Sequence, residues 1–69
     1  MVDRFFQKNV REITHSIRIT EDNNVNISLK NNQTGEISHI DMIHVNEELI
    51  TSMSEQLIMT GYTEIDIDN

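Results

Sequence analysis

Hydrophobic and polar positions alternate along most of this chain. In the segment 12–20 an isoleucine or histidine occupies every second position, and the polar residues between them would face the other way. The segments 24–31 and 36–43 are also rich in β-branched residues, a pattern typical of strands with one buried face. The turn-forming residues at 21–24 and 31–35 separate these three segments. Together they predict a meander of antiparallel strands.

The third of these segments is less regular than the other two. Ile37 and Ile43 share one parity, whereas Ile40 and Met42 share the other. A bulge near His39 explains this pattern, and so does a strand that is buried on both faces. The sequence does not distinguish between these alternatives.

The spacing predicts a helix over residues 2–10, because Val2, Phe5, Phe6 and Val10 recur at helical intervals. Arg4, Lys8 and Arg11 would form a basic stripe beside these apolar residues. We interpret this stripe as a solvated face of an amphipathic helix, or as a group that meets carboxylates of the same chain or of a neighbour.

A second helix is predicted over residues 47–60, with stronger signals at its ends. Asn46 suits the N-cap, and two glutamates follow in the first turn, where they complement the helix dipole. Gly61 suits the position after the helix, and Tyr62 could then contact Leu57. The predicted inward stripe of this helix consists of Leu49, Ile50, Met53 and Leu57.

Residues 62–68 alternate once more and predict a last strand with one acidic face. The resulting order is α-β-β-β-α-β. We therefore expect a small α+β fold, a single domain over residues 1–69, in which an antiparallel sheet carries helices packed on one face.

The length and composition limit how this domain can be stabilised. At 69 residues the core is small, and without cysteine there are no disulfides or thiolate metal sites. The surplus of isoleucine over other apolar residues favours a homodimer that buries more surface. There is no Ala, Pro or Trp, whereas Ile and Asn are abundant. This resembles an AT-rich coding bias, as in small proteins of phages, mobile elements and low-GC bacteria.

No apolar run approaches the length of a transmembrane helix, and the first residues lead into no apolar segment of a signal peptide. We expect a cytoplasmic protein.

Charge is distributed unevenly along the chain. Residues 1–30 hold all five basic residues and four acidic ones, whereas residues 31–69 hold eight acidic residues and no Lys or Arg. The net charge of −7 opposes direct binding to nucleic acid and to anionic membranes. The acidic half instead suits a protein partner with a basic surface.

The residue types needed for catalysis are poorly represented. Nucleophilic catalysis needs a nucleophile beside a base. The sequence has no cysteine, and it has no glycine-rich turn that would present a serine. The metal-like cluster is His39, Asp41 and His44, but His44 has the opposite strand parity to the other two. We expect no enzyme activity, no cofactor and no metal site.

The regular carboxylates of the last segment are the best candidates for function. Charged groups at every second position of a strand can imitate a phosphate backbone, although they also serve to protect a sheet edge from pairing. Two glutamates of the preceding helix would extend the acidic surface, and two apolar residues would anchor it. The candidate partner-binding residues are Glu48, Glu55, Met59, Tyr62, Glu64, Asp66 and Asp68.

Two functions fit these features. The first is a small non-enzymatic accessory or regulatory module, of inhibitor or nucleic-acid-mimic type, that docks an acidic surface onto a basic site of a partner protein. The alternative is a structural or assembly subunit, in which the basic and acidic parts of neighbouring copies pair and the sheet edges join in a symmetric homo-oligomer.

Overall fold

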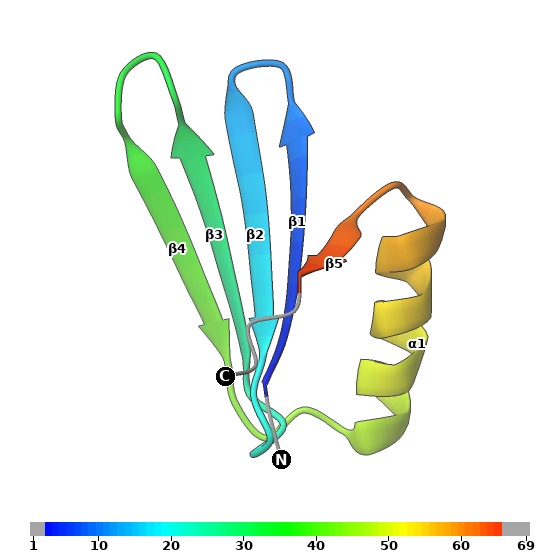
Figure 1. Ribbon diagram of the computed structural model, residues 1–69. Helices are drawn as coiled ribbons and strands as arrows, with labels where there is room; N and C mark the ends of the chain where they lie inside the picture. The colour runs from blue at the N-terminus through cyan, green and yellow to red at the C-terminus, as the bar shows by residue number, and fades with distance from the viewer. Residues whose placement is uncertain (1–2, 66–69) are drawn as a thin grey trace.

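The computed structural model describes residues 3–65, in which five strands and one helix follow in the order β-β-β-β-α-β. The strands form one sheet with the order β4-β3-β2-β1-β5, and all neighbouring strands are antiparallel. Figure 1 shows the first four strands side by side, with β5 and α1 beyond β1. The elements are β1 Arg4–Val10, β2 Ile13–Ile19, β3 Val25–Asn31, β4 Ile37–Met42, α1 Glu47–Met59 and β5 Thr63–Ile65.

The first element is a strand, so the predicted helix over residues 2–10 is wrong. The order α-β-β-β-α-β with helices on one face is wrong with it. Over so short a segment, Phe5, Phe6 and Val10 fit a helix and a strand about equally well. Pairing decides the outcome, because β1 forms a ladder with β2 along its whole length. Phe6 therefore points into the core, whereas Phe5 points to the opposite face of the sheet.

The central strands have one buried and one polar face. Phe6, Ile17 and Val25 lie on the face toward α1 and are buried. The other face carries polar residues such as Ser16 and Asn26. Because the two faces differ in this way, a slip of one residue between strands would expose the core, and the register is well determined.

The irregular third segment becomes the edge strand β4. It pairs with β3 from Ile37 to Met42 without a skipped residue, so there is no bulge near His39. It is also not buried on both faces, since every residue of the strand except Met42 is exposed. Its isoleucines occur on both parities because neither face of this edge is fully covered.

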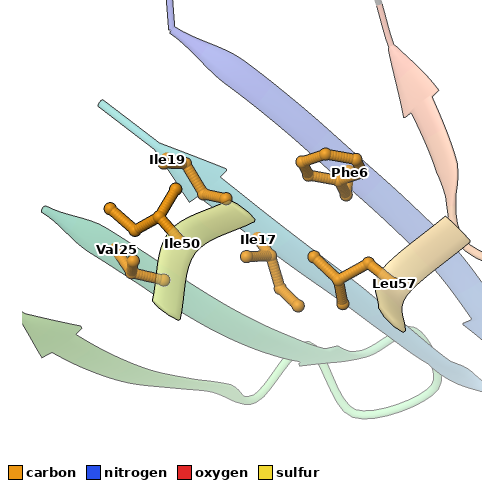
Figure 2. Close-up of a cluster of buried hydrophobic side chains, with 6 residues drawn as sticks. All are labelled: Phe6, Ile17, Ile19, Val25, Ile50 and Leu57. Carbon is orange, nitrogen blue, oxygen red and sulfur yellow. The ribbon is translucent and has the colours of Figure 1, made fainter. Parts of the chain in front are cut away.

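Helix α1 covers only part of the sheet. The tips of the β1–β2 and β3–β4 hairpins extend beyond it (Figure 1). Figure 2 shows Ile50 and Leu57 directed at the buried side chains of β1, β2 and β3. Burying an aliphatic or aromatic side chain of this size contributes about 1.5–3 kcal/mol. The core consists of Phe6, Ile17, Ile19, Val25, Ile50 and Leu57.

The predicted inward stripe of α1 is wrong at one position. Leu49 is 55% exposed, and Ser54 is buried instead. Ser54 lies four residues after Ile50 and three before Leu57, so it occupies the centre of the buried face. Its hydroxyl donates a hydrogen bond of 2.9 Å to the Ile50 carbonyl oxygen, which satisfies the buried polar group.

Both ends of α1 have the capping interactions that the sequence predicts. The side chain of Asn46 accepts a hydrogen bond of 2.8 Å from the Glu48 N–H. At the other end the Tyr62 N–H donates to the Leu57 carbonyl oxygen, and the Gly61 N–H donates to that of Ile58. Gly61 has a φ of +99°, which a residue with a side chain rarely adopts. These contacts end the helix and direct the chain into β5.

Candidate interaction surfaces

The outer face of α1 combines acidic groups with an exposed methionine. Glu48, Glu55 and Met59 lie at helical spacing on the side opposite the buried Ile50 and Leu57. All three are exposed, and the side chain of Met59 is 77% accessible. We call these three residues the acidic α1 face. The helix contains no Lys or Arg, so no cation of its own offsets this charge.

Tyr62 and Glu64, two other predicted partner-binding residues, lie elsewhere. Tyr62 is half-buried, packs against the core and shares a hydrogen bond of 3.2 Å with Nδ1 of His15. Glu64 lies beside β1 on the α1 side of the sheet, because it is the partner of Phe6 in the β1–β5 pairing. The structure therefore does not bring the five described members of the predicted set into one surface. The predicted residues Asp66 and Asp68 lie outside the described part of the chain.

Glu64 forms a bidentate ion pair with Arg4. Two hydrogen bonds of 2.9 Å join the guanidinium to the two carboxylate oxygens. These hydrogen bonds, assisted by the opposite charge, hold the pKa of Glu64 below its ordinary value and raise the pKa of Arg4. The carboxylate that would have been offered to a partner is thus partly neutralised within the chain.

The basic stripe of the predicted helix is instead distributed along β1 and its turn. Arg4 and Lys8 share a face with Phe6, and Lys8 donates a hydrogen bond of 2.6 Å to the carbonyl oxygen of Thr60 at the end of α1. This contact places a cation at the negative end of the helix dipole. Arg11 lies in the β1–β2 turn with a φ of +57°. The stripe is therefore neither helical nor continuous.

The metal-like cluster does not assemble. Nε2 of His39 lies 2.9 Å from a carboxylate oxygen of Asp41, and both side chains are about half exposed. His44 follows the strand with a φ of +55°. Within residues 3–65 no group of three or more His, Asp or Glu side chains is arranged to hold a metal ion.

A hollow of about 540 Å³ lies on the α1 side of the sheet, beyond the end of the helix. Its lining includes Ile13, His15, Leu29 and Ile37. The hollow opens to solvent and is mainly a part of the sheet that the helix does not reach. His15 at this hollow shares its hydrogen bond with Tyr62, and Ser38 is a further polar residue of the lining.

The outer edge of β4 is a candidate surface that was not expected from the sequence. Ile37 and Ile40 are 65% and 59% exposed on opposite faces of this strand, and Ile43 just after it is 68% exposed. The signal was present as isoleucines of both parities in residues 36–43. The same pattern also fits a bulge or a strand that is buried on both faces, because a strand's position in a sheet is not visible in its own sequence.

Comparison with protein-family models, with curated proteins and with solved structures finds no significant match. The helix found in residues 3–65 is too short and too polar to cross a membrane.

Proposed function

We propose that this chain is a small non-enzymatic accessory or regulatory module that works in the cytoplasm. It docks the acidic α1 face onto a basic surface of a partner protein. The observation that carries this proposal is the position of Glu48, Glu55 and Met59 on one exposed side of a well-capped helix. A rigid helix presents these groups with little loss of backbone freedom on binding.

The charge distribution supports this use of the helix. Arg4 and Lys8, on the neighbouring strand, are engaged by Glu64 and by the end of α1 respectively. The charge of Arg4 is thus compensated by Glu64, whereas Lys8 keeps its charge but holds it at the C-terminal end of α1, away from Glu48 in the first turn. The carboxylates of the acidic α1 face can therefore steer a basic partner toward the helix. Met59 would then provide apolar contact area once the surfaces meet.

The carboxylates of the last strand, which the sequence favours as the docking surface, are not central to this proposal. Glu64 is already paired with Arg4 in the same chain. This intramolecular pair also weakens the idea that basic and acidic segments pair between copies. The overall charge of −7 opposes direct binding to nucleic acid or to anionic membranes.

The experiment is a quantitative capture of interacting proteins at low and high salt. The variant Glu48→Gln/Glu55→Gln/Met59→Ser removes the acidic α1 face. The matched control Glu12→Gln/Glu36→Gln removes two exposed carboxylates at the hairpin tips, which lie away from the helix. We expect basic proteins to bind the wild type at low salt, to bind the control nearly as well, and to be lost from the α1 variant.

Equal loss in both variants would show that only net charge matters and would contradict the proposal. Retention of the same partners by the α1 variant would also contradict it. Purified partners identified in this way can then be titrated individually, with association rates that should fall as ionic strength rises.

A further inference from the structure

We infer that the outer edge of β4 pairs with β4 of a second copy of this chain, antiparallel and around a two-fold axis at Ile40. This inference goes beyond the proposed function and uses different residues. The resulting dimer would join two five-stranded sheets into one continuous sheet.

The edge of β4 that faces away from β3 has backbone groups, at defined positions, with which no strand within residues 3–65 pairs. The Asn31 N–H donates to the Glu36 carbonyl oxygen, which identifies these two residues as facing each other across the ladder. Inward-facing and outward-facing groups alternate along an antiparallel strand. The N–H and C=O groups of Ile37, His39 and Asp41 therefore point away from β3. They are available to another strand.

This edge lacks the features that normally prevent pairing. Residues 36–43 contain no Lys, Arg or Pro, and the β3–β4 ladder has no bulge. The opposite edge is different, because its strand β5 has only three residues within the described chain and Lys8 lies beside the part of β1 that β5 does not cover. Figure 1 shows β4 at the free side of the sheet, remote from α1. In the described part of the chain no element lies against the outer edge of β4, so a second strand can approach it.

The sequence of this edge is self-complementary in one register. If Ile40 faces Ile40 of the second copy, His39 faces Asp41 of that copy, and Ile37 faces Ile43. Within one chain His39 and Asp41 already lie 2.9 Å apart, so both side chains point to the same face and can be shared across the axis. A hydrogen bond between the His39 imidazole and the Asp41 carboxylate stabilises a cross-strand pair, and so does contact between aliphatic side chains.

The alternative register with His39 on the axis is less favourable. It places Ile37 opposite Asp41, so that an exposed isoleucine meets a carboxylate twice. In the register centred on Ile40, by contrast, the exposed isoleucines at 37, 40 and 43 all meet isoleucines. The direction of the backbone groups permits the register centred on Ile40. His39 and Asp41 are both outward-facing, so His39 of one copy can exchange backbone hydrogen bonds with Asp41 of the other.

The geometry also keeps charge repulsion low. A two-fold axis perpendicular to the sheet places both α1 helices on the same face, at the two sides remote from the new junction. The acidic helices are therefore well separated, and Asp41 is the one carboxylate that β4 brings to the junction. A dimer of this kind displays two acidic α1 faces to a partner.

Sedimentation velocity over a micromolar concentration series tests the dimer. We expect the wild type to shift from monomer to dimer, and Ile40→Asp to weaken association at least ten-fold because two carboxylates would face each other on the axis. The control Ile58→Asp makes the same change at an exposed isoleucine of α1 and should associate like the wild type. Circular dichroism verifies that each variant is folded. A wild type that stays monomeric overturns the inference and leaves the edge to a strand of another protein.

The register has its own test. His39→Asp would oppose two carboxylates, and Asp41→Lys would remove the carboxylate that accepts from His39, so each variant alone should dimerise roughly 5- to 30-fold more weakly. An equimolar mixture of the two variants should recover dimerisation. In the mixed dimer the carboxylate introduced into one chain faces the ammonium group introduced into the other, while the remaining His39–Asp41 pair is native. A mixture no better than its components overturns the register.

A cysteine on the axis provides a measurement that does not depend on weak association. The chain has no native cysteine. Directly opposed residues that do not exchange backbone hydrogen bonds have Cα atoms about 4.5 Å apart, which permits a disulfide. Ile40→Cys should therefore form a covalent dimer under mild oxidation at least ten times faster than the control Ile58→Cys. Equal rates would contradict the two-fold axis.

Discussion

Substitution of Phe6 and Phe5 tests whether the first element is a strand. In β1 these neighbours point to opposite faces, and Phe6 is 0% exposed in the core whereas Phe5 is half-buried on the polar face. Phe6→Ala should lower the free energy of unfolding by about 3–5 kcal/mol through lost transfer energy and the cavity left behind. Phe5→Ala should cost about 1 kcal/mol, because part of its ring is already in water.

The size of the first effect sets the design of the assay. A domain of 69 residues is stable by roughly 3.5–10 kcal/mol on the usual scale per residue. Phe6→Ala can therefore unfold the protein outright, so Phe6→Leu serves as a milder variant with an expected loss of about 1 kcal/mol.

Urea unfolding followed by circular dichroism, at a protein concentration low enough to keep the chain monomeric, gives the values for Phe5→Ala and Phe6→Leu, and for Phe6→Ala a value or an unfolded baseline. Equal losses for Phe5→Ala and Phe6→Ala would refute the opposite orientation of the two rings. A greater loss for Phe5→Ala would place the wrong ring in the core.

Three further substitutions test local features of the fold. Glu64→Gln removes the ion pair with Arg4 and should cost about 0.5 kcal/mol at neutral pH. Because the folded-state pKa of Glu64 is lowered, this contribution is present above the ordinary carboxyl range and is lost as the pH falls through the lowered pKa. Urea unfolding of wild type and variant should thus converge in acid, and a gap that widens in acid would contradict the assignment. Gly61→Ala should cost about 1 kcal/mol because of the positive φ, although the added methyl group would meet only Lys8 side-chain atoms at 3.6 Å. Thermal unfolding measures this, and an unchanged midpoint would argue against the Schellman ending. Ser54→Ala should be neutral or stabilising by up to about 0.5 kcal/mol, since Ser54 bonds only within its own helix. A loss above about 1 kcal/mol in the same assay would show a further partner of this hydroxyl.

Local chemistry accounts for the parts of the fold that the sequence predicted well. Asn46 and Gly61 mark the ends of α1 because each interaction that they make lies within a few residues along the chain. The turn containing Asn23, whose φ is +63°, likewise depends on a residue type that tolerates this conformation. Such signals act over distances shorter than one turn or hairpin, and they can be recognised without knowing the tertiary structure.

The candidate surfaces depend on contacts that are distant in sequence. Glu64 meets Arg4 across 60 positions, so its carboxylate could not be assigned to an ion pair from the sequence. The exposure of Leu49 and the burial of Ser54 likewise could not be predicted from the helix alone. One helical face is selected only by the sheet against which it packs.

By itself the sequence determined the strand periods of β2 and β3, the limits of α1 and the uneven charge, because these follow from residue types and short spacings. Tertiary structure decided that residues 4–10 are a strand, since a partner ladder outweighs a weak helical period. It also decided that β4 lies at an edge of the sheet, where no strand among residues 3–65 lies beside the backbone groups that face away from β3. Edge position is a property of the whole sheet, and no segment of the chain encodes it alone.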